Sequence, residues 1–140
     1  MEKRRQSLMP FVVDASVVAA WFLPNETSGI ADAAMARLEH EDCIAPDLLS
    51  HEFRNILLSA ERRKRIDQEA VFSILLRFTG LPLILVSGGD HVTIMRLAQK
   101  HSLSAYDAAY LALATSRSLP LATNDKKLAT AAASEGLAFS

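Results

Sequence analysis

The stretch FVVDASVVAAWF, residues 11–22, is apolar throughout except at Asp14 and Ser16. Residues 11–13 are aromatic and β-branched and predict a short buried strand, and residues 15–23 predict a helix that ends before a proline. Asp14 is therefore expected where a strand gives way to a helix. In open α/β sheets, ligands bind beyond the carboxyl ends of the strands. A carboxylate at this junction indicates a functional site as well as a helix cap.

The rest of the chain continues the alternation of strands and helices. Apolar runs predict further strands at residues 43–45, 83–86 and 119–122, with a possible last one at 137–139. Apolar residues spaced three and four apart predict helices at residues 29–38, 47–65, 67–79, 91–100, 104–117 and 126–133. Strands that alternate with helices imply βαβ units. We therefore expect one α/β domain in three layers, α/β/α, with a central and mostly parallel sheet of four to five strands.

The composition is that of a globular protein. A chain of 140 residues has the length of one domain, and a hydrophobic content of 50% is enough for a core without a disulfide or metal staple. The single cysteine, Cys43, excludes an internal disulfide, which agrees with a reducing cytoplasm. No uncharged stretch approaches the ~20 residues of a membrane span. We expect a cytoplasmic protein that does not enter a membrane.

The formal net charge of −1 is informative about nucleic-acid binding. A protein that binds nucleic acid through a broad electrostatic footprint is usually basic. Any nucleic acid would have to be held locally here, and the candidate cations are Arg62, Arg63, Lys64 and Arg65, with Lys3, Arg4 and Arg5 near the amino terminus. The basic run at 62–65 is also explained by a solvated helix end, where cations are favoured by the helix dipole.

Four acids have ordinary structural explanations when they are taken singly. Asp14 and Asp125 are both expected at helix starts, where an Asp cap is worth roughly 1 kcal/mol. Ser104 and Asp107 have the spacing of a capping box. Glu52 lies near the start of a long predicted helix, where a negative charge suits the dipole.

The surroundings of these acids favour a second explanation. Asp14 lies in an apolar run, Asp107 precedes the small-residue stretch AAYLALA, and no lysine or arginine lies within four residues of either. A buried carboxylate without a partner is costly. If four such groups converged to about 5 Å, each pair would repel by about 3 kcal/mol at an effective dielectric of 20. A divalent cation bound between them would turn this repulsion into a net attraction. Oxygen ligands suit Mg²⁺ or Mn²⁺, whereas the four histidines and Cys43 lack the spacings typical of zinc sites.

At this point the sequence resembles a known family. FVVDASVVAAWF, HEFRN (51–55), YDAAYLALA (106–114) and LATNDKKL (121–128) are similar to the four signatures of PIN-domain ribonucleases, and most of all to VapC-like toxins of toxin–antitoxin pairs. The four motifs occur in family order. The resemblance implies a single PIN domain at residues 9–140, preceded by a tail at 1–8.

The resemblance also implies a function and a site. It implies an Mg²⁺- or Mn²⁺-dependent endoribonuclease whose catalytic and metal-binding acids are Asp14, Glu52, Asp107 and Asp125. Ser16, Asn55 and Thr123 are implied as supporting residues that orient carboxylates or water, and capping or turn hydrogen bonds are the alternative for all three. Asn124 stands where some family members carry another acid.

The partners implied are an RNA substrate, a second copy of the chain in a homodimer, and an antitoxin that lays a helix along an apolar groove. Trp21, Phe22 and Leu23 are candidate groove residues, although such a cluster is also explained as core. Two other classes stay open. An aspartyl-phosphate phosphatase would attack phosphate through Asp14, but it uses a D-x-D motif and Ser16 occupies the second position. A PIN-like module that only binds RNA or protein is the remaining alternative.

Overall fold

The computed structural model describes residues 9–26 and 28–140; the predicted tail at 1–8 lies outside the described residues. The strands are β1 (Phe11–Val13), β2 (Cys43–Pro46), β3 (Leu83–Val86) and β4 (Leu121–Ala122). The helices are α1 (Ala15–Phe22), α2 (Gly29–Arg37), α3 (Leu48–Arg62), α4 (Gln68–Thr79), α5 (His91–His101), α6 (Ala105–Arg117) and α7 (Lys126–Ser134). Each predicted helix is present, with ends that differ by at most three residues.

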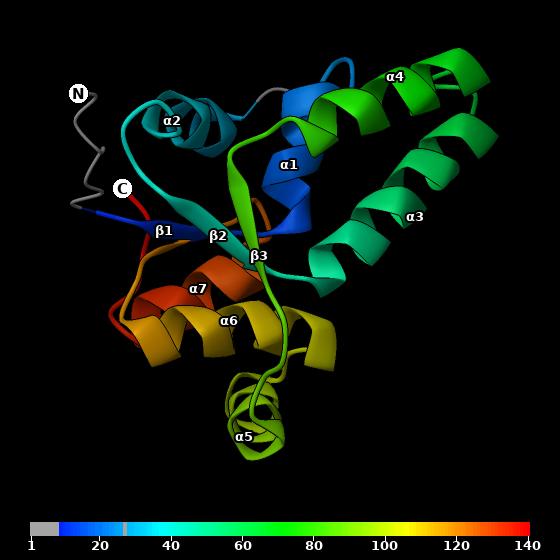
Figure 1. Cartoon of the computed structure of the whole chain (residues 1–140). Coiled ribbons are helices and arrows are strands. Elements are labelled where there is room, and N and C mark those ends of the chain that lie inside the picture. Colours follow the sequence, from blue (N-terminus) through cyan, green and yellow to red (C-terminus); the bar gives the residue numbers. More distant parts are fainter. Residues whose placement is uncertain (1–8, 27) are drawn as a thin grey trace.

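The four strands form one parallel sheet in the order β3-β2-β1-β4. Figure 1 shows α6 and α7 on one face of the sheet and α1 and α2 on the other, with α3 and α4 extending from that second layer. The three-layer α/β/α prediction is confirmed. Because all strands run the same way, the segments that follow β1, β2 and β4 leave from one edge of the sheet.

Two predicted elements differ from the structure. Residues 137–139 contribute an isolated bridge between Leu121 and Ala138, so the sheet has four strands in the described chain. The long predicted helix ends at Arg62 because Lys64 takes a left-handed conformation, with φ of 60°. The Arg65 amide then donates to the Ala60 carbonyl at 2.9 Å, which satisfies a carbonyl at the helix end.

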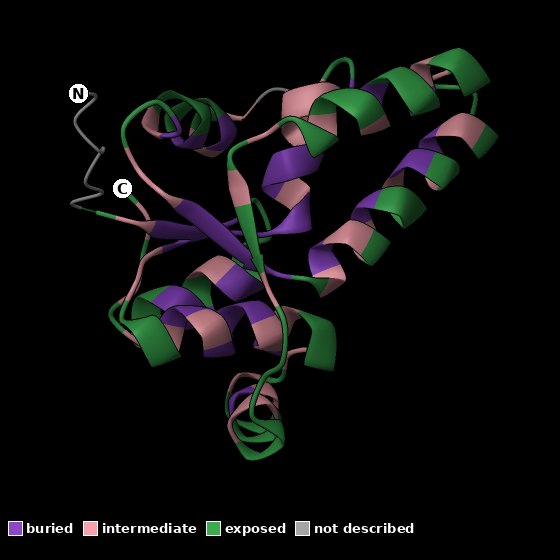
Figure 2. Cartoon of the chain, viewed as in Figure 1, coloured by how far each residue is buried: buried purple, intermediate pink, exposed green. Residues whose placement is uncertain are grey.

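The core lies between the sheet and its two helical layers. Figure 2 shows β1 and β2 buried, whereas much of α4 and α5 is exposed. The side chains of β1 are buried on both faces of the sheet, as expected for a central parallel strand covered by helices. None of the described helices is long and apolar enough to cross a membrane.

Arg37 joins the two ends of the described chain. Its guanidinium carbon lies 4.9 Å from the Phe11 ring centroid and 4.7 Å from that of Phe139. The same group donates to the carbonyls of Met9 at 2.8 Å and Ser140 at 3.2 Å. One side chain at the end of α2 thus holds the segment before β1 against the carboxyl terminus.

An Arg37→Ala variant is expected to lose about 2 kcal/mol of unfolding free energy. Each cation–π contact contributes about 0.5–1 kcal/mol and each hydrogen bond about 1 kcal/mol, less the entropy of ordering the side chain. Urea denaturation measures the loss. Arg96→Ala is the matched control, because Arg96 is an exposed arginine and its loss should change stability by less than about 0.5 kcal/mol. Equal effects of the two variants would contradict the assigned role.

Candidate active site

Asp14 is a buried carboxylate at the junction of β1 and α1. Its side chain is 4% exposed. Oδ1 accepts a hydrogen bond from the Val17 amide at 3.2 Å and one from the Ser16 hydroxyl at 2.6 Å, so Asp14 does cap α1 as a favoured N-cap residue. Oδ2 accepts from the Thr123 hydroxyl at 2.5 Å. Three of about four acceptor positions of this carboxylate are occupied, which leaves one on Oδ2.

Ser16 and Thr123 link Asp14 to the segment after β4. The Ser16 hydroxyl donates to Asp14 and accepts from the Asn124 amide at 3.0 Å. The Thr123 hydroxyl, 2% exposed, donates to Asp14 and accepts from the Asp125 amide at 3.0 Å. Two hydroxyls therefore orient one carboxylate and at the same time hold the backbone that carries the next acid. These contacts fit both the predicted orienting role and the alternative of turn hydrogen bonding.

Asp125 caps α7 and lies on the same edge of the sheet. Its Oδ1 accepts from the Leu128 amide at 2.9 Å. The carboxylate is at the surface, so the capping explanation applies to Asp125 as it does to Asp14. Its Oδ2 keeps its acceptor capacity.

Glu52 points from α3 toward α6. Its Oε1 accepts a hydrogen bond from the Tyr110 hydroxyl at 2.5 Å. Burial raises the pKa of this carboxyl, the Tyr110 hydrogen bond opposes that rise, and the charge of Asp107 adds to it. Glu52 is thus bound by one residue of α6 and repelled by the charge of another.

Asp107 lies in the first turn of α6, where its amide donates to the Ser104 hydroxyl at 3.1 Å. Burial raises the pKa of the Asp107 carboxyl, and the charge of Asp125 raises it further. The Ser104 hydroxyl and the charge of Lys127 act in the opposite direction. The pKa of Asp107 thus depends on one acid and one base of the segment that follows β4.

Mutual repulsion connects the four predicted acids. Burial raises the pKa of Asp14 to about 6, Ser16, Thr123 and Val17 lower it by hydrogen bonding, and the charge of Asp107 adds a further rise. Asp107 therefore interacts electrostatically with Asp14, Glu52 and Asp125. Within residues 9–26 and 28–140, none of the four forms an ion pair with a lysine or arginine. Among the described residues, the fold thus brings negative charge to one edge of the sheet with no lysine or arginine ion-paired to it, and Lys127 acts on Asp107 only through its charge.

The donor set fits a hard divalent cation. Carboxylate oxygens are the ligands that Mg²⁺ and Mn²⁺ prefer, and Asp14, Glu52 and Asp125 each keep an oxygen with acceptor capacity. The acids are nevertheless not drawn into a ready-made ligand shell: within the described part of the chain, no group of three or more His, Cys, Asp and Glu side chains has metal-binding geometry. Close approach of uncompensated carboxylates is opposed by their repulsion.

The other predicted site residues lie on α3 or just after it and are exposed. Asn55 is exposed, and its side chain has no hydrogen-bond partner among the described residues. Arg62, Arg63 and Lys64 are exposed at the end of α3. Arg65 pairs with Glu26 at 3.2 Å and also donates to a carbonyl of the loop after α1. The helix-end explanation therefore describes Arg65 better than a free phosphate contact does.

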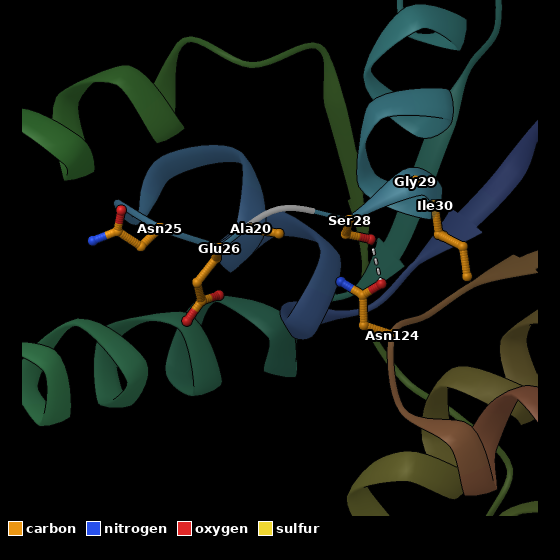
Figure 3. A pocket seen from close by; sticks show the side chains of 7 residues that line it. All are labelled: Ala20, Asn25, Glu26, Ser28, Gly29, Ile30 and Asn124. Atoms are coloured by element: carbon orange, nitrogen blue, oxygen red, sulfur yellow. Dashed lines mark hydrogen bonds between the residues drawn. The ribbon is translucent and has the colours of Figure 1, made fainter.

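A surface pocket adjoins the acids next to Asn124 (Figure 3). It is lined by Ala20, Asn25, Glu26, Ser28, Gly29, Ile30 and Asn124. The Ser28 hydroxyl donates to Asn124 Oδ1 at 2.5 Å, as Figure 3 shows. Asn124 directly precedes Asp125, and the Asn124 backbone amide donates to the Ser16 hydroxyl. The pocket therefore lies next to the residues of the site.

Sequence reasoning did not identify Tyr110 as part of the site. This phenol is 1% exposed and contacts Glu52 across 58 positions of sequence. Besides Glu52, the charges of Asp14 and Asp107 raise the pKa of Tyr110, so its hydroxyl lies in the field of three acids. The one signal in the sequence was a tyrosine three residues after Asp107, which places both on one helix face.

Comparison with known proteins identifies the family of this chain. A family model described as PIN domain matches residues 11–134. The chain therefore belongs to the PIN-domain family.

Individual relatives narrow the comparison. The chain is 31% identical over 128 residues to Ribonuclease VapC3 of Pyrobaculum aerophilum, which covers 86% of this chain and 93% of that protein. The crystal structure of PAE2754 from Pyrobaculum aerophilum superposes with a TM-score of 0.71 at 25% identity, over 88% of this chain and 84% of that one. VapC20 of Mycobacterium tuberculosis, described as a sarcin-ricin loop cleaving toxin, superposes with a TM-score of 0.59 at 13% identity, over 86% and 94% of the two chains, and shows the shared fold.

Proposed function

We propose that this protein is a divalent-metal-dependent endoribonuclease and the toxin of a toxin–antitoxin pair. The observation that carries the proposal is the arrival of four acids at one edge of the sheet. The charge of Asp107 raises the pKa of Asp14 and Glu52, and that of Asp125 raises the pKa of Asp107. Within the described residues, no lysine or arginine is ion-paired to any of the four. The 31% sequence identity to a ribonuclease, over 86% of the chain, supports RNA as the substrate.

Asp14, Glu52, Asp107 and Asp125 would hold Mg²⁺ or Mn²⁺. When bound, the cation supplies Lewis-acid activation of water and stabilises charge that develops on the phosphate. Ser16 and Thr123 keep the Asp14 carboxylate in one orientation, and Tyr110 holds Glu52. The hydrogen bonds of Ser16 and Thr123 to the Asn124 and Asp125 amides keep the two sides of the site together. We propose that Asn55 contributes to orienting water, as its position one turn from Glu52 suggests.

RNA would be held by local contacts. Arg62, Arg63 and Lys64 are free to meet phosphates, about 15 Å along the α3 axis from Glu52 at 1.5 Å per residue. A single strand that crosses the site could reach both. We assign Arg65 a weaker part, because Glu26 neutralises it.

Exposed apolar residues support the two protein partners. Phe72 and Leu76, the latter 77% exposed, lie one turn apart on α4 and suit an antitoxin helix. Trp21 and Phe22 are partly buried and Leu23 is buried, so they border such a groove at most. Exposed apolar groups cluster at interaction sites.

A second apolar surface suits a homodimer. It comprises Ile84 and Leu85 on the edge strand β3, and Val92 and Met95 on α5, which follows that strand. An edge strand with exposed apolar side chains is prone to pair with another chain. Because its proposed substrate is RNA, we place the activity in the cytoplasm.

The test is cleavage of a mixed RNA substrate by the purified protein in Mg²⁺. Cleavage is expected to disappear in excess EDTA and to return when Mn²⁺ is added in excess of the chelator. The reason is that the cation supplies the positive charge that activates water and stabilises the phosphate. Cleavage that persists in EDTA would refute the metal-dependent mechanism. An absence of cleavage together with tight RNA or partner binding would favour the non-catalytic alternative.

A further inference from the structure

A hydrogen bond links a side chain of α6 to the acid that α3 contributes to the site. The Tyr110 hydroxyl donates to Glu52 Oε1 at 2.5 Å. The most extensive contacts of α3 are with α1 and α4, whereas those of α6 are with α5, α7 and the strands. No second described residue donates a hydrogen bond to the Glu52 carboxylate. The position of this carboxylate relative to Asp107 therefore depends on Tyr110.

We propose that Tyr110 is a positioning residue that keeps the Glu52 carboxylate in the acid cluster, ready to bind a divalent cation. The inference rests on the proposed function and extends it to a residue outside the four acids. Tyr110 lies one turn after Asp107 on the same face of α6. One helix thus carries an acid of the site and the hydrogen-bond donor to the carboxylate of another.

The charges around Glu52 explain why such a donor is needed. Glu52 is half-buried, and Asp107 repels it. A glutamate side chain has three rotatable bonds, so without a tether its carboxylate would relieve the repulsion by turning toward solvent. Hydrogen bonds to charged groups are among the stronger ones in proteins, and this one opposes the repulsion from Asp107. Tyr110 therefore favours the observed orientation of the carboxylate.

A purely structural explanation makes a different prediction. A buried phenol hydroxyl needs a partner, and Glu52 could serve only to satisfy it. In that case, removal of the hydroxyl would change stability and leave cation binding unaffected. Phenylalanine separates the two explanations, because it keeps the packing of the ring and removes only the donor.

The test compares Mn²⁺ binding by Tyr110→Phe and wild type in the absence of RNA, by calorimetry. Loss of a partner that orients a metal ligand typically weakens metal affinity 10- to 100-fold, and we expect about tenfold here. Tyr106→Phe is the matched control, since Tyr106 lies on the same helix and is 64% exposed. Its affinity should equal that of wild type. An unchanged affinity in Tyr110→Phe would overturn the proposal.

A double variant shows whether Tyr110 acts through Glu52. In a Glu52→Ala background, Tyr110→Phe is expected to change Mn²⁺ affinity by less than about twofold, because the positioned group is already absent. A further tenfold loss in that background would show that Tyr110 acts by another route and would overturn the assignment.

A crystal structure of metal-free Tyr110→Phe makes the test independent of both catalysis and metal affinity. We expect the ring to stay in place and the Glu52 carboxylate to turn away from Asp107. A carboxylate that keeps its orientation would refute the positioning role. If RNA cleavage is never observed but Glu52 moves as expected, the proposed function fails and the positioning role stands.

Discussion

An Asp107→Asn variant is expected to lose RNA cleavage by more than about a hundredfold while it remains folded. Asp107 is the acid whose charge reaches Asp14, Glu52 and Asp125, so its amide analogue removes the centre of the negative field. Loss of a residue that hydrogen-bonds a metal ligand typically lowers metal affinity or activity 10- to 100-fold. Loss of a ligand itself should lower activity by more than that. Single-turnover cleavage of a labelled RNA measures the effect.

The fold of this variant should not suffer. The hydrogen bond from the Asp107 backbone amide to the Ser104 hydroxyl is retained, because the substitution does not change the backbone. Removal of the charge at residue 107 also relieves its repulsion from Asp125. Asp67→Asn is the matched control, because Asp67 is an exposed helix-start aspartate on α4 and asparagine caps helices equally well. Near-normal cleavage by Asp107→Asn, with Asp67→Asn unchanged, would remove Asp107 from the machinery.

An Asp14→Asn variant is expected to be more stable than wild type in the absence of metal. Burial raises the pKa of Asp14 from 3.8 to about 6, with the hydrogen bonds of Ser16, Thr123 and Val17 acting against that rise. Ionisation at neutral pH therefore costs the folded state about 3 kcal/mol. Asparagine removes that cost, and its amide can donate to the Thr123 oxygen while its carbonyl accepts from Ser16. We expect a gain of about 1–3 kcal/mol at pH 7.5 in EDTA.

The direction of the pH dependence follows from the raised pKa. The folded state binds the Asp14 proton more tightly than the unfolded chain does, so the contribution of this group to stability is greatest below about pH 4. It declines as the pH rises from about 4 to above 6, by about 3 kcal/mol in all. Metal-free wild type should show this loss in urea denaturation, and Asp14→Asn should show a smaller one.

Metal is expected to reverse the order of the two proteins. Saturating Mn²⁺ stabilises a protein that binds it in the folded state, so wild type should gain stability and Asp14→Asn should gain little. Asp67→Asn again serves as control, since Asp67 makes the same capping bond to a helix amide at the surface. If Asp14→Asn instead unfolds the metal-free protein, Asp14 is essential as a cap for α1 and its assignment as a metal ligand is wrong.

Much of the architecture could be predicted because it depends on local patterns. The apolar run at 11–13, the spacing of apolar residues along 48–62 and the small residues that follow Asp107 each define an element within a few residues of its observed ends. The main departure, the end of α3, arises at Lys64, where a non-glycine residue adopts a left-handed conformation. Nothing in the local sequence of charged residues signals that turn.

The candidate site could also be predicted only in part. The sequence by itself determined which acids follow strands or open helices, since Asp14, Asp107 and Asp125 are at helix starts that local patterns mark. Only the tertiary structure decided which side chains meet. Thr123 reaches Asp14 across 109 positions and Tyr110 reaches Glu52 across 58.

The physical reason is the range of the interactions. Helix and strand formation follows from hydrogen bonds and apolar spacing over a few residues, which a sequence displays directly. Contacts such as those of Thr123 and Tyr110 depend on the strand order β3-β2-β1-β4 and on the packing of α3 and α6 around it. Sequence separation carries no distance, so the partners of each acid appear only when the sheet is assembled.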